Sequence, residues 1–287
     1  MGSTASHVRP ETPVPCTVCG GTAASLLFRS DAEVYRCAYC THAFSDMASI
    51  ADLETYGPEY YERIHQNWFA HPDLDLFAWI AAQFPEGTRS VLDVGCGKGA
   101  FLRFLRDGRY QLERLVGVDI SPNDPETGIE YRQADFSKMR DDERFDVVVS
   151  LAVIEHVSNP VAFVRGLATR CNPGGVVVVM TLDNDSLLYA AARLLANIGV
   201  RAPAMRLYSA HHLQHFTHRS LKAALKEVGL EVIVTCHHNA PMAALDIPAR
   251  NFLVKLAFTA GVAGLFWLGT LTRRTYLQTI AATRRKT

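Results

Sequence analysis

Hydrophobic and polar positions follow two different patterns along this 287-residue chain. Between residues 87 and 240, short runs that are apolar throughout alternate with segments whose apolar residues recur every three or four positions. The first pattern is typical of buried strands and the second of amphipathic helices. Strands without a polar face indicate a parallel sheet that helices cover on both sides. We therefore expect an α/β fold.

The strands and helices of this region can be placed from the same pattern. Apolar runs predict strands at 90–95, 115–120, 129–136, 145–153, 175–182 and 230–236. Helical spacing predicts helices at 100–108, 160–170, 186–198 and 218–228, with a loop from 199 to 215. The pattern corresponds to about seven strands, with the last pair antiparallel. Ligands of such sheets bind outside the C-terminal ends of the strands.

The chain outside this region divides into further parts. Residues 1–14 are polar and proline-rich, which indicates a disordered lead-in without a signal peptide. Residues 15–48 carry two cysteine pairs on short hairpin strands, and residues 49–86 are helical in pattern, as a linker or lid would be. Residues 87–240 form the main α/β domain in this interpretation, and residues 241–287 a C-terminal helical segment.

The C-terminal segment is unusually apolar. Between Arg250 and Arg273 its only charged residue is Lys255. A helix that spans a membrane needs about 20 apolar residues. The basic residues that follow the run, Arg273, Arg274, Arg284, Arg285 and Lys286, suit an anionic membrane surface. A helix on the membrane surface, a spanning helix, and packing in the core or an oligomer all remain open.

Charge and composition leave most classes of function open, but they argue against a protein that binds nucleic acid. Lys and Arg together number 29, as do Asp and Glu, so the formal net charge is zero. A protein that binds nucleic acid usually has a basic excess, so a nucleic-acid substrate is disfavoured. Cys96, Cys171 and Cys236 are scattered and odd in number, which fits reduced thiols and a cytoplasmic location. Oligomeric state is not indicated.

The remaining four cysteines predict a zinc ribbon. Cys16 and Cys19 form one Cys-x2-Cys pair and Cys37 and Cys40 a second, with 17 residues between the pairs. Two such pairs can surround one tetrahedral zinc ion, and four thiolates leave no open position, so the role is structural. A module of about 30 residues cannot fold without such a metal. We expect the main domain to fold independently of this metal site, and the neighbouring His42 to be a surface residue.

A glycine-rich loop marks a ligand site after the first strand of the main domain. Asp93 is followed by Gly95, Gly97 and Gly99, and then by a helix. Glycine allows the backbone to approach a ligand closely, and a helix N-terminus favours an anionic group. The spacing is G-x-G-x-G, preceded by an acid, which differs from the G-x-G-x-x-G of dinucleotide sites.

With these residues, the stretch from Val91 to Leu182 resembles the core of the class I S-adenosylmethionine-dependent methyltransferases, whose sheet is Rossmann-like. The resemblance implies that the glycine loop lies against the methionine part of S-adenosylmethionine and that Asp93 orients its ammonium group. It also implies that Asp119, after the second strand, binds the ribose hydroxyls. Asp135, with Phe136 beside it, would then receive the adenine amino group.

Three histidines are candidates for a general base, because imidazole titrates near working pH. Many members of the family carry a Glu-His pair after the fourth strand, as in Glu155 and His156 here. His212 and His215 lie in a segment that resembles the His-Leu-x-x-Phe-Thr stretch of zinc-ribbon methyltransferases acting on sugars and related metabolites. Shaping the pocket, packing and metal binding remain alternatives for these residues.

The zinc-ribbon relatives also suggest a lid. In them, a segment similar to Tyr56-x3-Tyr60-Tyr61 folds over the cofactor, although aromatic packing between the ribbon and the core is the alternative. The resemblance as a whole implies methyl transfer, preferably to oxygen, with a small metabolite, sugar or glycan intermediate as acceptor. The apolar C-terminal run favours instead a lipid-linked or quinone-like acceptor at a membrane surface, with the protein cytoplasmic or peripheral. Nucleic-acid methylation and an inactive cofactor-binding scaffold are weaker alternatives.

Overall fold

The computed structural model describes residues 14–50, 66–108, 110–139, 142–245 and 251–285. The lead-in and the three tyrosines of the predicted lid, Tyr56, Tyr60 and Tyr61, lie outside these ranges. Of the helical segment predicted at residues 49–86, the described part contains two short helices, α2 (Gln66–Ala70) and α3 (Leu74–Ala81). Short 3-10 helices occur at η1 (Met47–Ser49), η2 (Phe136–Lys138), η3 (Ile154–His156) and η4 (Met242–Ala244).

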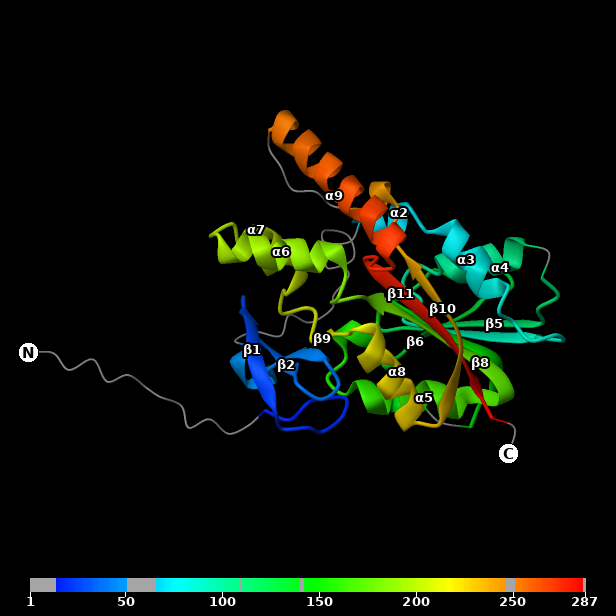
Figure 1. The fold of residues 1–287 in the computed structure, drawn as a ribbon. Helices are drawn as coiled ribbons and strands as arrows, with labels where there is room; N and C mark the ends of the chain where they lie inside the picture. Colours follow the sequence, from blue (N-terminus) through cyan, green and yellow to red (C-terminus); the bar gives the residue numbers. More distant parts are fainter. Residues whose placement is uncertain (1–13, 51–65, 109, 140–141, 246–250, 286–287) are drawn as a thin grey trace, which may run out of the picture.

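A seven-stranded, mostly parallel sheet forms the centre of the molecule (Figure 1). Its order is β10 (Leu230–His238), β11 (Leu277–Arg284), β8 (Cys171–Leu182), β7 (Phe145–Leu151), β4 (Ser90–Val94), β5 (Arg114–Asp119) and β6 (Glu130–Gln133). The six strands predicted from apolar runs are all present, with bounds close to those expected. Only β11 runs antiparallel to its neighbours, and it does so on both sides.

The strand β11 corrects the prediction for residues 241–287, which was a helical segment throughout. Leu277 pairs with Leu182 of β8 at one end, and Thr283 pairs with Val176 at the other. The segment is short and rich in Ala and Thr, so it lacks the apolar run that predicts a buried strand. Small side chains nevertheless fit a position between two strands, where Ala281 is fully buried.

Helices cover both faces of the sheet, as predicted. α3 and α4 (Ala100–Asp107) pack into one apolar cluster, and α5 (Pro160–Arg170) and α8 (His218–Glu227) into another. The strands serve both clusters because successive side chains point to opposite faces: Val91 of β4 belongs to the first cluster and Leu92 to the second. α6 (Leu187–Asn197) and α7 (Ala202–Leu207) lie beyond the carboxyl ends of the strands, and α7 occupies part of the predicted loop.

The N-terminal module packs against the main domain. It contains β1 (Ala24–Arg29), β2 (Glu33–Cys37) and β3 (Ala43–Ser45), and β3 pairs with β9 (Gln214–His215) from the main domain. Three of its cysteines lie in the same apolar cluster as α5 and α8. The sequence did not predict this because β9 is only two residues long, which is too short to produce a periodic pattern.

His42 is buried, whereas the sequence analysis placed it at the surface. Its Nε2 lies 2.9 Å from Oε1 of Gln214, and its Nδ1 lies 3.3 Å from Oγ of Ser220. The Phe216 ring lies 4.5 Å from the imidazole, centroid to centroid. Burial lowers the pKa of His42 to about 4, so the ring is neutral and belongs to the interface between module and domain.

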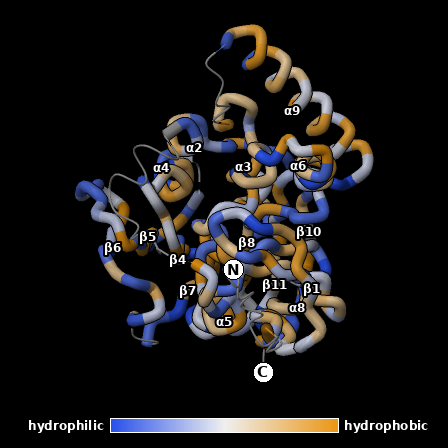
Figure 2. Tube along the Cα trace, turned by 90° about the vertical axis from the view of Figure 1, so that its left-hand side faces the viewer, coloured by the Kyte–Doolittle hydropathy of each residue, from blue (hydrophilic) through white to orange (hydrophobic). Residues whose placement is uncertain are grey.

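The apolar run forms a single long helix, α9 (Phe252–Thr272), inserted between β10 and β11. It projects from the domain beside α6 (Figures 1 and 2), and only Phe266 and Gly269 of its residues are buried. Among the described helices it is the one long and apolar enough to cross a membrane by length and composition. Of the predicted basic tail, Arg273 and Arg274 directly follow α9, whereas Arg284 lies away from it. Arg284 donates to carbonyl oxygens of Ala168 and Cys171 at the opposite edge of the sheet.

Candidate active site

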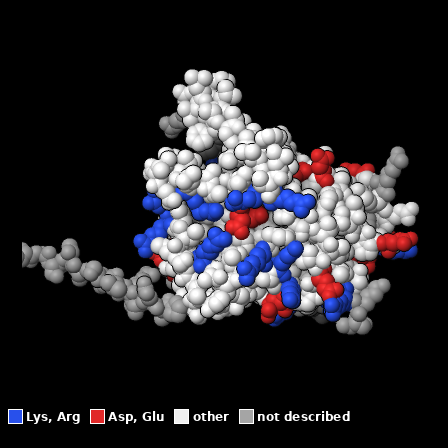
Figure 3. Space-filling model, in the orientation of Figure 1, with Lys and Arg blue, Asp and Glu red and all other residues white. Residues whose placement is uncertain are grey.

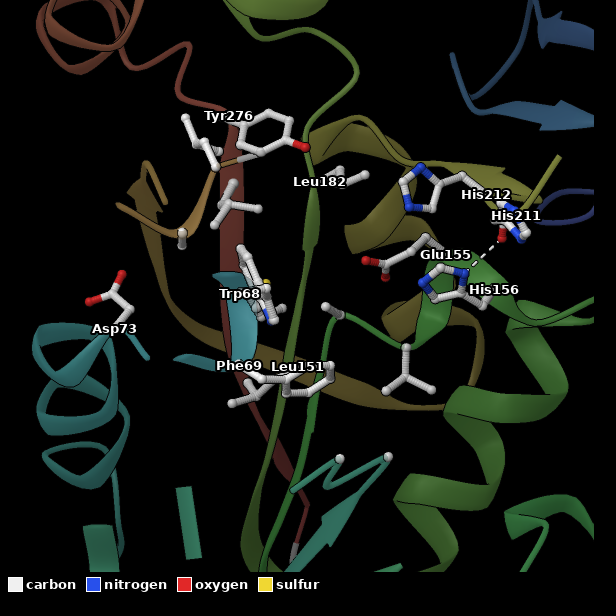
Figure 4. A pocket seen from close by; sticks show the side chains of 18 of the residues that line it. Trp68, Phe69, Asp73, Leu151, Glu155, His156, Leu182, His211, His212 and Tyr276 are labelled. Atoms are coloured by element: carbon white, nitrogen blue, oxygen red, sulfur yellow. Dashed lines mark hydrogen bonds between the residues drawn. The ribbon is translucent and has the colours of Figure 1, made fainter. Parts of the chain in front are cut away.

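A large cavity opens at the carboxyl ends of the central strands (Figure 4). Its volume is about 1310 Å³, which exceeds the roughly 300–1,000 Å³ of a typical single-ligand pocket. The loops after β4, β5 and β6 line one part of it, and α6, α7 and α9 line another. This is the edge of the sheet at which the sequence predicted a ligand site, and the cavity has room for two ligands side by side.

The glycine loop adopts backbone conformations that side chains rarely allow. Gly95, Gly97 and Gly99 have φ values of 73°, 52° and 73°. A Cβ on Gly95 would lie 2.2 Å from Cγ2 of Val153, and one on Gly97 would lie 2.7 Å from the Phe69 ring. Glycine is therefore required both by conformation and by space, as the sequence pattern predicted. Gly95 and Gly97 line the cavity, and Gly99 begins α4.

Asp119 ends β5, and the backbone holds its carboxylate firmly. One oxygen accepts from the Gly97 N–H at 2.8 Å, and the other accepts from the Ser121 N–H at 2.8 Å. Each carboxylate oxygen can accept a second hydrogen bond. The side chain is buried and lines the cavity, so it can receive ligand hydroxyl groups while it stays fixed to the glycine loop.

Asp93 lies at the end of the neighbouring strand in a different environment. It is buried, it lines the cavity, and its Oδ1 has no hydrogen-bond partner among the described residues. Burial raises its pKa to about 8, and the charge of Asp119 adds to the effect. An unsatisfied buried carboxyl oxygen on a cavity wall fits a ligand with a cationic donor, such as the ammonium group of S-adenosylmethionine.

Asp135 and Phe136 also line the cavity, in the segment that follows β6. Oδ1 of Asp135 accepts from the backbone N–H and the hydroxyl of Ser137, at 2.9 and 2.7 Å, and these bonds lower its pKa. The Phe136 ring is held edge-on to Phe163, and the Arg170 guanidinium lies 4.4 Å from its centre. A fixed ring and a partly exposed carboxylate can accommodate a flat base that carries an amino group.

His156 is oriented by a backbone contact. Its Nδ1 lies 2.7 Å from the carbonyl oxygen of His211 (Figure 4). A carbonyl only accepts, so Nδ1 carries the proton and donates it. In the neutral ring the lone pair is then on Nε2, as a general base requires. His156 is the last residue of η3, which follows β7. His156 and His211 both line the cavity and are joined by this hydrogen bond.

His212 and Glu155 lie beside this pair. The His212 ring is 5.0 Å from the His156 ring, centroid to centroid. Glu155 is buried, its Oε2 accepts from the Thr181 hydroxyl at 2.8 Å, and burial raises its pKa to about 7. The cavity wall thus holds the imidazoles of His156, His211 and His212 beside the carboxyl group of Glu155.

His215 is not brought to the cavity. It lies in β9, where it is 1% exposed, and neither ring nitrogen has a hydrogen-bond partner among the described residues. Burial holds its pKa well below the usual range. The ring packs 4.8 Å from that of Tyr208, so its environment is that of a core residue. Of the three histidine candidates, the structure brings only His156 and His212 together.

Several cavity residues were not predicted from the sequence. Trp68 and Phe69 of α2 and Tyr276 after α9 all line the wall (Figure 4). Burial raises the pKa of Tyr276 to about 12. For Trp68 and Phe69, the sequence offered one indication, an adjacent Trp and Phe within a short polar segment. Tyr276 gave none, because its position depends on the unforeseen strand β11.

The four cysteines of the N-terminal module come together as predicted. All four sulfur atoms of Cys16, Cys19, Cys37 and Cys40 lie within 4.8 Å of one another. The Cys16 and Cys40 sulfurs are 3.5 Å apart, and those of Cys19 and Cys37 are 3.6 Å apart. Tetrahedral zinc with Zn–S bonds of ~2.3 Å needs sulfur separations of this size, so the donor set fits zinc.

Together, the sheet with its single antiparallel strand, the glycine loop and the strand-end acids define a class I S-adenosylmethionine-dependent methyltransferase. The chain belongs to the methyltransferase-domain family, whose model matches residues 66–235.

Curated relatives of this chain are methyltransferases by name. The chain is 30% identical over 148 residues to a mitochondrial ubiquinone biosynthesis O-methyltransferase of Dictyostelium discoideum, covering 44% of each protein. It is 29% identical over 160 residues to a ubiquinone biosynthesis O-methyltransferase of Stutzerimonas stutzeri, covering 51% of this chain and 68% of the relative. In the first of these matches the chain spans under half of the relative's length.

A solved structure with the same fold is that of a complex between the Haloferax volcanii Trm112 methyltransferase activator and a methyltransferase. The TM-score is 0.52 at 18% identity, and the match covers 79% of this chain and 92% of the other. The likeness concerns the fold alone.

Proposed function

We propose that this chain transfers a methyl group from S-adenosylmethionine to a hydroxyl oxygen of a bulky, largely apolar acceptor of the quinol or phenol type. The relatives that are named ubiquinone biosynthesis O-methyltransferases support oxygen as the acceptor atom. The sequence analysis favoured a small metabolite, sugar or glycan. The walls of the cavity favour the apolar alternative.

The composition of the acceptor side of the cavity carries this proposal. α6 and α7 contribute Leu188, Leu195 and Leu207 to the wall, and α9 contributes Phe258 and Val262. A sugar needs hydrogen-bond partners for its hydroxyl groups, whereas an aromatic ring with an alkyl chain is stabilised by burial of ~25 cal/mol per Å². The volume left beside the cofactor residues suits such an acceptor.

The cofactor residues fit S-adenosylmethionine in a specific orientation. Asp93 would hold the ammonium group, Asp119 the ribose hydroxyls, and Asp135 the adenine amino group beside the Phe136 ring. When bound, S-adenosylmethionine supplies an electrophilic methyl group. The fixed glycine loop and the two buried acids would hold the cofactor beside the acceptor side of the cavity.

His156 acts as the general base in this proposal. Its Nε2 would take the proton of the acceptor hydroxyl as the oxygen–methyl bond forms and the sulfur–methyl bond breaks, which leaves S-adenosylhomocysteine. The His211 carbonyl keeps Nδ1 protonated. The ring then returns the proton to water. His212 packs against His156 and limits its rotation, while the buried Glu155 and the surrounding aromatic residues exclude water.

We also propose one structural zinc ion, held by Cys16, Cys19, Cys37 and Cys40. The ion would fix β3, and through the β3–β9 pairing it would fix the segment that carries His211 and His212. It takes no part in methyl transfer, since four thiolates leave no open position. Elemental analysis of protein purified without chelator should give one zinc per chain, and its absence would contradict this assignment.

Turnover with defined acceptors tests the main proposal. We expect methylation of phenols, with kcat/KM rising as an attached alkyl chain is lengthened. His156→Ala should lower kcat about 10²–10⁴-fold and leave the affinity for S-adenosylhomocysteine unchanged. His237→Ala, on β10 outside the cavity wall, is the matched control. Turnover of sugars but not of phenols, or full activity in His156→Ala, would contradict the proposal.

A further inference from the structure

The outer surface of α9, α6 and α7 is apolar over a large area, which we name the apolar crest. The helices α6 and α9 pack beside each other and project beyond the sheet (Figures 1 and 2). Phe252 is 76% exposed and Trp267 is 65% exposed. The other exposed apolar residues of the crest are Leu194, Ile198, Val200, Met205, Leu253, Val254, Leu256, Phe258, Leu268 and Leu271. Contiguous apolar surfaces of this kind mark binding sites.

Basic side chains border the crest. Figure 3 shows Lys and Arg gathered in a band directly below the apolar projection. The elements of the crest contribute Arg201 and Arg206 at α7 and Arg273 and Arg274 after α9. Apolar surface with a basic border matches the hydrocarbon and the anionic headgroups of a lipid leaflet, respectively. If a second copy of the chain covered the crest instead, the basic borders of the two copies would lie together and repel each other.

The geometry excludes a helix that crosses the bilayer while the domain stays on one side. α9 has 21 residues, which gives a length of about 31 Å, close to the ~30 Å of the hydrocarbon core. Leu245 lines the cavity, and seven residue steps separate it from Phe252. Even fully extended, these steps reach only about 24 Å. Both ends of the insertion are therefore anchored on the same side, and α9 can only enter one leaflet.

The cavity opens at this same surface. Phe258, Val262 and Leu265 of α9 line it from one side, and Leu195 and Val200 line it from the α6–α7 side. Phe258 and Val200 are also exposed on the crest. A molecule dissolved in the hydrocarbon can therefore pass from the crest to the cavity along continuous apolar surface.

We propose that the apolar crest docks on an anionic lipid leaflet and that the acceptor enters the cavity from the hydrocarbon between α9 and α6. The docking stands on the crest and its basic border. The entry route rests in addition on the proposed function, since it requires an apolar acceptor.

Flotation with lipid vesicles tests the docking without any turnover. The full chain should bind vesicles that contain phosphatidylcholine and phosphatidylglycerol. It should bind vesicles of phosphatidylcholine alone at least tenfold more weakly. The double variant Leu253→Asp/Leu256→Asp, which leaves the cavity wall intact, should reduce binding by tenfold or more because carboxylates resist entry into hydrocarbon. Ile233→Asp is the matched control, because this residue is exposed on β10 outside the crest. Equal binding by the double variant and the control would overturn the proposal.

Trp267 reports directly on where α9 lies. Its emission should move to shorter wavelength when anionic vesicles are added, and Trp267→Phe should lose this shift but still float with the vesicles. If the crest instead joins two copies, light scattering will show a dimer that Leu253→Asp/Leu256→Asp converts to monomer, without vesicle binding. That result would overturn the docking.

The entry route has its own test. Methylation of a long-chain phenol should be faster with anionic vesicles than in detergent, and this gain should be absent in Leu253→Asp/Leu256→Asp. Vesicle binding with turnover of sugars only would contradict the proposed function and leave the docking intact. Turnover of long-chain phenols without vesicle binding would contradict the docking and leave the function intact.

Discussion

Asp93 and Asp119 lie at the ends of adjacent strands, and their carboxyl groups differ in their hydrogen bonds to the backbone. Two N–H groups hold the Asp119 carboxylate, whereas Oδ1 of Asp93 has no hydrogen-bond partner among the described residues. Burial, with the nearby Asp119 charge, raises the pKa of Asp93 to about 8. In the empty site near pH 7, most Asp93 side chains carry a proton, and an arriving cation must displace it.

This displacement predicts that cofactor affinity depends on pH. The cationic ligand binds the ionised form of Asp93, so binding releases a proton below the pKa of about 8. The Kd for S-adenosylhomocysteine should fall as pH rises from 6 to 7.5, by up to about tenfold per pH unit. Calorimetry in two buffers of different ionisation enthalpy measures the released proton. Asp93→Asn should bind more weakly and show neither effect. A flat profile in the parent would contradict the assignment of the ammonium group.

Asp119 gives a second prediction. Asp119→Ala should weaken the binding of S-adenosylhomocysteine by roughly 1.5–3 kcal/mol, the usual cost of losing charge-assisted hydrogen bonds. The exposed Asp124, five residues further on, provides the control variant Asp124→Ala. Isothermal titration measures both. Unchanged affinity in Asp119→Ala would mean that the ribose lies elsewhere.

Buried Glu155 predicts a change of stability with pH. Its pKa is raised to about 7, so between pH 4.5 and 7 the folded protein binds a proton that the unfolded chain has lost. The contribution of Glu155 to the free energy of unfolding is greatest below pH 4.5 and is lost as pH rises through 7. Urea denaturation should show a smaller decrease over this window in Glu155→Gln than in the parent. Identical pH profiles would contradict the burial of this group.

At the residue scale, local spacing predicted the acids, the glycines and the cysteines because each follows a strand or forms a tight turn. The roles of His156 and His215 could not be separated in this way. Both follow short irregular segments, and which of them reaches the cavity depends on the pairing of β9 with β3, a contact between residues about 170 positions apart. His42 was misplaced for the same reason.

The pairing of β3 with β9 joins the cysteine module to the catalytic wall. Gln214 is its main polar connection. Its Oε1 accepts from Thr17 at 2.7 Å and lies 2.9 Å from His42, and its Nε2 donates to the carbonyl of Val157 at 2.9 Å. Val157 directly follows His156, so a single side chain links the module to the general base of the proposed mechanism.

Gln214→Ala should therefore lower both stability and turnover. The buried His42 would lose a hydrogen-bond partner, which typically costs 1–3 kcal/mol. We expect a decrease of that size in the free energy of unfolding, with kcat reduced and cofactor affinity retained. Thr22→Ala, at a module turn away from β9, is a control for general loosening of the module. A variant with unchanged stability and reduced kcat would show that Gln214 positions the catalytic wall without stabilising the fold. If neither the free energy of unfolding nor kcat changes, Gln214 does not connect the module to His156.

Elements were predicted where the pattern was long. The strands β4, β7 and β8 follow continuous apolar runs, and α5 follows helical spacing with Pro160 at its start. β11 was missed because its Ala-rich sequence carries no strong preference. Its conformation is determined by the gap between β8 and β10, which only tertiary structure creates.

For the whole molecule, α9 is an insertion within a hairpin. His238 of β10 pairs with Leu277 of β11, and Asn239 accepts from the Tyr276 N–H at 2.9 Å, so the two strands are adjacent where the insertion begins and ends. Replacement of residues 246–273 by a short Gly-Ser linker should keep the sheet and the cofactor affinity. Deletion of residues 250–287 removes β11 and should give aggregated protein. Circular dichroism and cofactor titration compare the two, and loss of fold in the linker variant would assign α9 to the core.

The position of β11 also determines the order in which the domain can assemble during synthesis. β10 leaves the ribosome well before β11, but its only strand partner among the described residues is β11. The apolar helix therefore emerges while one edge of the sheet is still open. Strand pairing that waits for a distant segment is slow and exposes apolar surface. A nascent chain of this protein thus presents α9 to its surroundings before the catalytic cavity exists.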